Sequence, residues 1–284
     1  MIQEIYPKVF YPEYRRKKAN PENNKKSFLL FFEYNKIMLI KDILTKEVRL
    51  PRFEDLEEED EEVYDKSYYA NSVDDEEFYI VDNLVLPEFA GFYMEGIHAL
   101  REFTPSYQAF AAVSASQVYR WLQSRKYCGY CGTKTEKSDT ERAIICPKCK
   151  NIEYPKISPA IIVAVMDGDR LLLTKNAKGI YKYYALVAGF VEVGETLEQA
   201  VAREVMEEVG LKVKNIKPYK SQPWSFSDTI MLAFTAQLDG DDKITLQEEE
   251  LSEAAWFDRK DVPVLPFHIS VGHELIHKFR DGEI

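Results

Sequence analysis

The sequence predicts an α+β protein whose carboxyl-terminal half is a mixed α/β sandwich. Three observations predict it. Short apolar runs of strand length occur in both halves of the 284-residue chain, one strongly patterned helix lies among those of the second half, and all four cysteines fall in a short segment between the halves. This length suggests about two domains, and a hydrophobic content of 45% is enough to build their cores.

The amino-terminal region, residues 1–125, has the pattern of a small α+β domain. Strand-like runs occupy residues 27–34, 37–40 and 78–85. Between them, residues 54–62 contain eight acids in nine positions, a composition typical of a solvated, mobile loop. Residues 111–125 carry apolar side chains at helical spacing, which predicts a helix that leads into the cysteine segment.

The cysteines form two CxxC pairs, Cys128 with Cys131 and Cys146 with Cys149, and 14 residues separate the pairs. Two such pairs predict a zinc ribbon, in which four thiolates hold one structural Zn²⁺ and leave no open position for catalysis. Disulfides are the alternative, and they are disfavoured because the chain shows no secretory signal that would place it in an oxidising compartment. We therefore expect a ribbon domain over residues 126–155.

Residues 156–284 alternate strand-like runs with one helix, as expected for a mixed α/β sandwich. Strands are predicted at residues 160–166, 170–174, 212–215, 231–238 and 254–257. Asp167, Gly168 and Asp169 make a tight turn between the first two strands, which therefore form a hairpin.

The helix of this half is bounded by local signals at both ends. Thr196 followed by Gln199 is a capping box, and Gly210 is a good helix stop. Apolar residues recur at helical spacing between these signals: Leu197, Ala200, Val201, Val205 and Val209. The helix is therefore expected to pack this face against a core.

Glu204, Glu207 and Glu208 stand at i, i+3 and i+4 and share another face of this helix. Like charges this close are unfavourable unless cations or arginines neutralise them, and Arg203 is expected to pair with only one of them. Mg²⁺ or Mn²⁺ is the expected counter-ion, because hard cations prefer carboxylate and water oxygens. Gly189 is expected to permit a sharp backbone path before the helix, where its carbonyl can reach a metal. A solvated acidic face is the alternative.

Between residues 189 and 211 every fixed position of the 23-residue Nudix box is filled. These positions are Gly189, Glu195, Arg203, Glu204, Val205, Glu207, Glu208, Gly210 and Leu211. The chain therefore resembles the Nudix hydrolases, a family that uses divalent cations to split a nucleoside diphosphate linked to another group. The resemblance implies the Nudix α/β/α sandwich with a mixed sheet for residues 156–284.

Residues 221–229, with the sequence SQPWSFSDT, resemble the SQPWPFPxS array of the NADH pyrophosphatase branch of this family. Ser225 and Ser227 replace two prolines and Thr229 replaces the last serine, which makes the expected loop less rigid. The order of an amino-terminal domain, a four-cysteine ribbon, the YPKISPAII strand entry and the box resembles that branch over nearly the whole chain.

The resemblance implies hydrolysis of NADH, and less efficiently of NAD⁺ and related dinucleotides, to AMP and nicotinamide mononucleotide. It also implies removal of NAD caps from RNA, which leaves a 5′-monophosphate. The implied metal ligands are Glu204, Glu207, Glu208 and Glu250. The residues implied to contact substrate are Tyr154 and Phe190 at the bases, and Gln222, Trp224 and Met231 in the substrate loop. The branch is commonly dimeric, with that loop completing the partner's site.

A diphosphate resists attack because its oxygens repel nucleophiles, so bound cations must neutralise that charge and activate a coordinated water. We expect Glu208 to act as the base or as a metal ligand, and Glu204 and Glu207 to act as ligands. Arg203 is expected to orient these glutamates. Clustered carboxylates titrate as a set, so the sequence does not assign their individual roles.

His273, Glu274 and His277 fit the HExxH signature of zinc metallopeptidases. Ser270 as an N-cap, followed by apolar residues at helical spacing, favours an ordinary amphipathic helix instead. Arg280 stands where one large peptidase class requires glycine. We therefore expect no catalytic zinc at this motif.

The chain has a net charge of −11, which argues against broad, nonspecific binding to nucleic acid but leaves a local basic groove open. No apolar run is long enough to cross a membrane, and the amino terminus lacks the pattern of a signal peptide, so a cytoplasmic location is expected. Two alternatives to the NADH reading stay open: hydrolysis of ADP-ribose or another dinucleotide, and a noncatalytic sensor of nucleotide or RNA.

Overall fold

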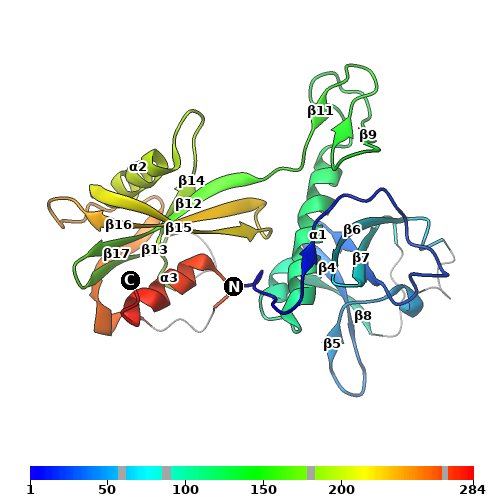
Figure 1. Ribbon diagram of the computed structural model, residues 1–284, viewed down its shortest axis with the longest axis horizontal. Coiled ribbons are helices and arrows are strands. Elements are labelled where there is room, and N and C mark those ends of the chain that lie inside the picture. Colours follow the sequence, from blue (N-terminus) through cyan, green and yellow to red (C-terminus); the bar gives the residue numbers. More distant parts are fainter. Residues whose placement is uncertain (57–61, 85–90, 178–182, 264–267) are drawn as a thin grey trace. The chain divides into compact units, whose positions relative to one another are not determined.

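The computed structural model describes residues 1–56, 62–84, 91–177, 183–263 and 268–284 (Figure 1). The chain divides into two compact units. One unit consists of residue 1 with residues 157–224 and 228–284, and the other of residues 2–156 with residues 225–227. The expected division into three domains at residues 125/126 and 155/156 stays a prediction. No helix among the described residues is long and apolar enough to cross a membrane.

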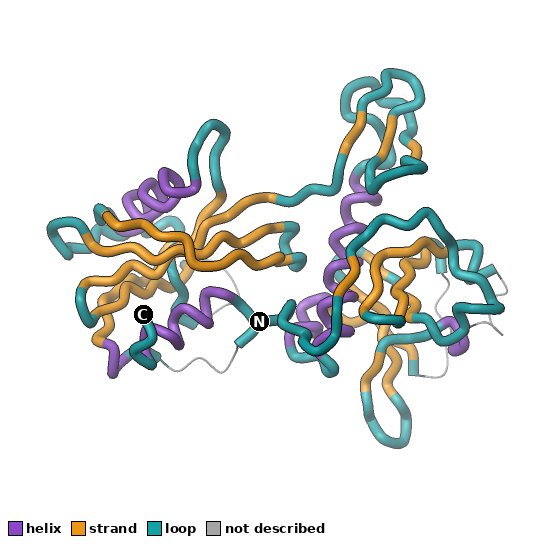
Figure 2. Tube along the Cα trace, in the orientation of Figure 1, coloured by secondary structure: helices purple, strands orange, loops and turns teal. Residues whose placement is uncertain are grey.

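The amino-terminal part of the second unit is built on two small sheets and one long helix (Figure 2). The first sheet has the order β1 (Phe10–Tyr11), β6 (Ser67–Val73), β7 (Glu76–Val81), β2 (Phe28–Leu30). In the second, β4 (Lys36–Lys41) pairs with β3 (Phe32–Glu33), β5 (Val48–Arg49) and β8 (Phe92–Gly96). Strands are therefore present in the expected runs 27–34 and 37–40, whereas the run 78–85 is strand only as far as Val81 and its residue 85 lies outside the described residues. A core of buried aromatic and aliphatic side chains lies between these strands.

Helix α1 (Ser106–Ser124) begins five residues before the expected start. Its N-cap is Pro105, which makes no side-chain cap hydrogen bond, so the sequence carries no start signal there. The solvated loop expected over residues 54–62 is wrong at its beginning, because Asp55 lies in the 3₁₀ helix η1 (Phe53–Asp55). Both oxygens of Asp55 accept from Arg49, at 2.6 and 2.7 Å, and this hydrogen bonding holds the pKa of Asp55 below its ordinary value against the effect of burial. Residues 57–61 lie outside the described residues.

The cysteine segment folds as a three-stranded antiparallel ribbon. Its strands are β9 (Glu136–Lys137), β10 (Ile144–Ile145) and β11 (Ile152–Glu153), with β10 in the middle. Because β10 pairs with both neighbours, the two CxxC turns lie at the same end of a small sheet that has little core of its own.

The carboxyl-terminal unit is the expected α/β/α sandwich. Its sheet has the order β15, β16, β12, β13, β17, and β14 also pairs with β12. Their bounds are β12 (Ser158–Asp167), β13 (Arg170–Asn176), β14 (Val187–Phe190), β15 (Val213–Trp224), β16 (Thr229–Leu238) and β17 (Leu251–Asp258). The β12 and β16 pair is parallel and the other pairs are antiparallel, so the sheet is mixed.

The two helices of this unit cover opposite faces of the sheet (Figure 1). Strand β12 alternates its side chains between them: Ile161 and Val163 pack toward α2 (Leu197–Val209), and Ala164 packs toward α3 (Val271–Arg280). The expected hairpin is confirmed, because Asp167 pairs with Arg170 across Gly168 and Asp169, with Gly168 at φ +58°.

Strand β15 is longer than expected, because it continues from Val213 to Trp224 instead of ending near residue 215. It lies at the edge of the sheet, where Pro218 and Pro223 are tolerated because one side of an edge strand needs no backbone donors. The expected substrate loop is therefore a β-hairpin, with residues 221–224 at the end of β15 and Thr229 at the start of β16.

Candidate active site

The four cysteine sulfurs lie within 4.8 Å of one another and form no disulfide. The two CxxC turns have the same construction. The amide of Gly132 donates to the carbonyl of Cys128, and the amide of Lys150 donates to the carbonyl of Cys146, at 2.9 and 3.0 Å. Both Gly132 and Lys150 have positive φ. Two matched turns that converge four thiols fit one tetrahedral zinc ion.

Helix α2 has the predicted boundaries. The hydroxyl of Thr196 accepts from the amide of Gln199, the side chain of Gln199 accepts from the amide of Thr196, and Gly210 closes the helix with φ +70°. The capping box and the helix stop are therefore confirmed. The helix buries Val201 and Val205 against the sheet and turns the glutamates toward β14.

Gly189 lies on β14 directly against the side chain of Glu204. A Cβ atom at Gly189 would stand 2.0 Å from Cδ of Glu204, far inside van der Waals contact. Gly189 is an ordinary strand residue paired with Ile161 and does not have a positive φ. The expected reason for this glycine, a sharp backbone path, is therefore wrong: the position needs glycine because a carboxylate occupies the space of its side chain.

Arg203 joins three carboxylates, although the sequence suggested only one partner. Its guanidinium donates to both oxygens of Glu195 at 2.8 and 3.0 Å, to Glu204 at 2.9 Å and to Glu207 at 3.0 Å. A further bond at 2.9 Å reaches the carbonyl of Phe190 on β14. Arg203 thus links the segment before α2, at Phe190 and Glu195, to the glutamates on the helix. Its hydrogen bonds lower the pKa of the Glu195 carboxyl.

Glu208 has the most perturbed carboxyl of the cluster. It is 6% exposed, and burial, followed by the charges of Glu204, Glu250 and Glu207, raises its pKa to about 8. Burial also raises the pKa of Glu204, although Arg203 opposes this shift. Arg203 pairs with Glu204 and Glu207. Glu208 forms no ion pair with a lysine or arginine among the described residues, so no cationic side chain neutralises its charge.

The charge of Glu250 acts on both Glu204 and Glu208, so the fold brings this exposed glutamate to the box although it lies just before β17. Four acidic groups with one arginine are a fitting donor set for a hard divalent cation. Among the described residues, the cysteines are the one group of three or more candidate ligands whose atoms all lie within 4.8 Å. The carboxylate oxygens of the glutamate cluster are thus spread more widely than the cysteine sulfurs.

The residues implied to contact substrate occupy different places. Tyr154 is 58% exposed and its hydroxyl donates to Glu141 at 3.3 Å, whereas Phe190, the second residue of the box, is 55% exposed at the end of β14. Gln222 and Met231 face each other across the β15 and β16 hairpin. Their contact with substrate stays a prediction.

Gln222 is fully buried, and its amide links the hairpin to the start of α3. It donates to the carbonyl of Ile269 at 3.0 Å and accepts from the amide of Val271 at 2.7 Å. Trp224 is half-buried at the end of β15. At the hairpin turn Phe226 is buried and its ring stacks on His98, with centroids 5.6 Å apart. The side chain of Phe226 thus packs inward.

The HExxH motif lies on α3, and the predicted N-cap is confirmed: the hydroxyl of Ser270 accepts from the amide of His273 at 3.2 Å. Glu274 accepts from Lys220 at 2.7 Å, in an ion pair with the edge strand. His273 and His277 are both buried against the sheet and belong to no metal-binding group of described residues. The amphipathic helix is therefore the better description.

Comparison with known protein families identifies two domains in the chain. Residues 156–279 match the NUDIX domain, and residues 123–154 match the NADH pyrophosphatase zinc ribbon domain. The chain therefore contains a Nudix domain preceded by a zinc ribbon domain. The Nudix domain covers the sandwich with both helices, and the ribbon match contains all four cysteines.

Curated relatives that are similar to this chain include the NAD-capped RNA hydrolase NudC of Shigella flexneri and that of Escherichia coli (strain K12 / DH10B). Each is 48% identical over 160 residues, which are 56% of this chain and 62% of the relative. The match therefore spans less than two thirds of these relatives. A solved NUDIX hydrolase from Nitrosomonas europaea is similar with 28% identity and a TM-score of 0.48, over 55% of this chain and 90% of that one.

Proposed function

We propose that this Nudix protein hydrolyses the diphosphate bond of NADH, and also of NAD⁺ and NAD-capped RNA. The products are nicotinamide mononucleotide with AMP, or with 5′-monophosphate RNA. The main support for the proposal is the carboxylate cluster of the box. Glu208 is buried close to the charges of Glu204 and Glu250, and Arg203 binds Glu204 but not Glu208. A purely binding module has no need for such a costly concentration of negative charge.

We propose Mg²⁺ or Mn²⁺ at this cluster, where the cation supplies charge neutralisation for the diphosphate and a water of lowered pKa. Glu204, Glu207, Glu208 and Glu250 provide the oxygen donors. Arg203 holds Glu204 and Glu207 by hydrogen bonds and so positions them without touching substrate. Glu208 serves either as one of these donors or as the base that accepts the proton of the attacking water, because it is buried beside Glu204 and Glu250.

The choice of substrate is supported by two comparisons. The ribbon matches the domain found in NADH pyrophosphatases, and the relatives that are 48% identical are named NAD-capped RNA hydrolases. We further propose that Tyr154 and Phe190 contact the bases, and that Trp224 and Met231 line the same substrate. Both exposed aromatic rings are free to stack on a flat base. Gln222 acts by holding the hairpin to α3.

The function is tested by incubating the purified protein with Mg²⁺ or Mn²⁺ and, separately, NADH, NAD⁺, ADP-ribose and NAD-capped RNA, with chromatography of the products. Glu207→Gln removes one cluster carboxylate, and Glu198→Gln makes the same chemical change at an exposed position of the same helix. We expect AMP and reduced nicotinamide mononucleotide from NADH, lost in the first variant and retained in the second.

Turnover confined to ADP-ribose would move the protein to another Nudix activity, which the loss of two hairpin prolines at Ser225 and Ser227 makes a specific alternative. No turnover of any substrate, with cation still bound, would support a nucleotide sensor instead. Equal loss of activity in Glu198→Gln would show that the effect is not specific to the cluster.

We also propose that the ribbon holds one structural zinc and that the protein works as a homodimer in the cytoplasm. The four converged thiols without a disulfide support a reducing compartment. Sedimentation of the purified protein tests the dimer, and a monomer would remove the reason to place Trp224 in a partner's site.

A further inference from the structure

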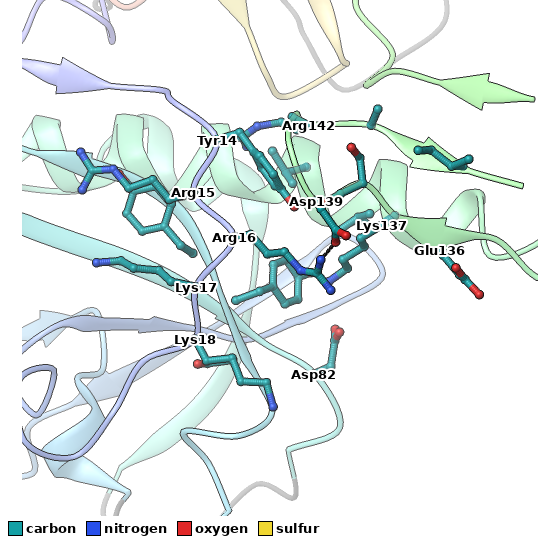
Figure 3. A pocket seen from close by; sticks show the side chains of 18 of the residues that line it. Tyr14, Arg15, Arg16, Lys17, Lys18, Asp82, Glu136, Lys137, Asp139 and Arg142 are labelled. Atoms are coloured by element: carbon teal, nitrogen blue, oxygen red, sulfur yellow. Dashed lines mark hydrogen bonds and ion pairs between the residues drawn. The ribbon is translucent and has the colours of Figure 1, made fainter. Parts of the chain in front are cut away.

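The unit of residues 2–156 and 225–227 contains a large cavity of about 840 Å³ that is separate in composition from the glutamate cluster. Its walls are the extended segment of residues 14–18, strand β6, helix α1 and the ribbon (Figure 3). The volume lies within the range of sites that enclose a small organic ligand.

The cavity is basic in an acidic protein. Of the described residues that line it, eight are lysine or arginine and four are aspartate or glutamate, a formal balance of +4 in a chain of net charge −11. Residues 15–18 alone provide four consecutive cations, Arg-Arg-Lys-Lys. Focusing of positive potential in a hollow favours an anionic ligand.

The cations at the rim are held in pairs that an anion can replace. Arg16 pairs with Asp139, and both side chains are more than 60% exposed. Lys18 pairs with Asp65 at 3.4 Å, again between exposed side chains. Exposed ion pairs of this kind stabilise a fold little, so a multiply charged phosphate competes for the same cations.

By contrast, Arg142 is structural: it donates to the backbone carbonyls of Pro12 at 2.9 Å and Ala70 at 2.8 Å, which fixes the ribbon to the amino-terminal strands. Lys137 of the ribbon strand β9 lies 3.5 Å from the centroid of the Tyr68 ring. These contacts give the cavity a fixed wall between two parts of the same unit.

The inner wall combines apolar surface with unpaired donors. Val118 and Leu122 of α1 and Pro147 of the ribbon line the cavity. The indole nitrogen of Trp121, a residue that is 5% exposed, and the hydroxyl of Tyr68 have no hydrogen-bond partner among the described residues. These two donors are enclosed within the wall itself, so the surface that this wall offers to a ligand is apolar.

We propose that this cavity binds a nucleoside phosphate, with the phosphate on Arg16 and Lys18 and the flat base against the apolar wall near Trp121. A free phosphate would leave the apolar wall uncovered, and an uncharged aromatic ligand would leave the cations unused. The same chemistry is present in a free mononucleotide and in one residue of a single RNA strand. This binding is independent of hydrolysis by the glutamate cluster.

The test measures equilibrium binding of AMP by calorimetry and of a short fluorescein-labelled oligoadenylate by anisotropy, without added divalent cation and in the Glu207→Gln background to prevent turnover. The variant Arg16→Glu with Lys18→Glu reverses two rim cations. Lys36→Glu with Lys46→Glu makes the same change of charge at exposed positions of this unit outside the cavity.

We expect the rim variant to bind at least roughly tenfold more weakly than its control, which retains the parent affinity. Leu122→Gln, which makes part of the apolar wall polar, should also weaken binding while the thermal midpoint confirms folding. Similar affinity for AMP and the oligonucleotide assigns the site to free nucleotide, and binding of the oligonucleotide alone assigns it to RNA. Equal affinity of the rim and control variants, or no saturable binding of either ligand, would overturn the proposal.

Discussion

Replacing Glu208 by glutamine should stabilise the carboxyl-terminal unit while it abolishes activity. The pKa of this buried carboxyl is about 8 in the folded protein, against its ordinary value of 4.5. Each pKa unit corresponds to about 1.4 kcal/mol of stability. At pH 7, folding therefore costs up to about 3 kcal/mol to keep this group protonated or to bury its charge. Glutamine has nearly the same shape and lacks this cost.

The sign follows from proton binding. Because the folded-state pKa of Glu208 is raised, the folded chain binds more protons than the unfolded chain between pH 4.5 and 8. Stability contributed by the carboxyl is fully present below pH 4.5 and is lost as the pH rises toward 8. The gain from Glu208→Gln should accordingly be small near pH 5 and grow to about 3 kcal/mol or more at neutral pH and above.

Scanning calorimetry at about pH 5, 7 and 8.5, which covers most of the interval between the two pKa values, would resolve the transition of the affected unit in buffer without added divalent cation. Added Mg²⁺ should stabilise the parent protein more than the variant, because binding to the folded state raises its midpoint. A variant that is less stable than the parent, or a difference that does not change with pH, would refute the reasoning.

Four further substitutions test the site and the ribbon. Gly189→Ala would force the Glu204 carboxylate to move, and Arg203→Lys would remove its fixed fork of donors, so each should lower the rate of NADH hydrolysis roughly 10- to 100-fold. Cys146→Ser should abolish stoichiometric zinc binding, measured by metal analysis. His273→Gln should leave that rate unchanged. Full activity of the first two, zinc retained by the third, or inactivity of a folded fourth would contradict these assignments.

Sequence reasoning succeeded where the determining interactions are local. The capping box at Thr196, the stop at Gly210 and the turn at Gly168 depend on residues no more than four positions apart. It failed for β15, which continues through two prolines because its partner β16 supplies pairing that no local pattern records. Strand β14 was not predicted for the same reason, since four residues give too short a pattern and their pairing with β12 is long-range.

The basic cavity likewise could not be predicted from local sequence patterns. The run of four basic residues at 15–18 is visible in the sequence, but its aromatic and ribbon neighbours come from positions 68, 121 and 137. A net charge of −11 gave no sign of this local balance. Only folding places these side chains around one volume.

The sequence by itself determined the family pattern, the four-cysteine ribbon and the helix face that carries Glu204, Glu207 and Glu208, because helical periodicity fixes which neighbours share a face. The tertiary structure decided what that face can do. It joined Arg203 to carboxylates before and within helix α2, set Gly189 against Glu204, and buried Glu208 without a cationic partner among the described residues. Those contacts and that burial arise from packing between separate strands and helices, and local spacing carries no information about either.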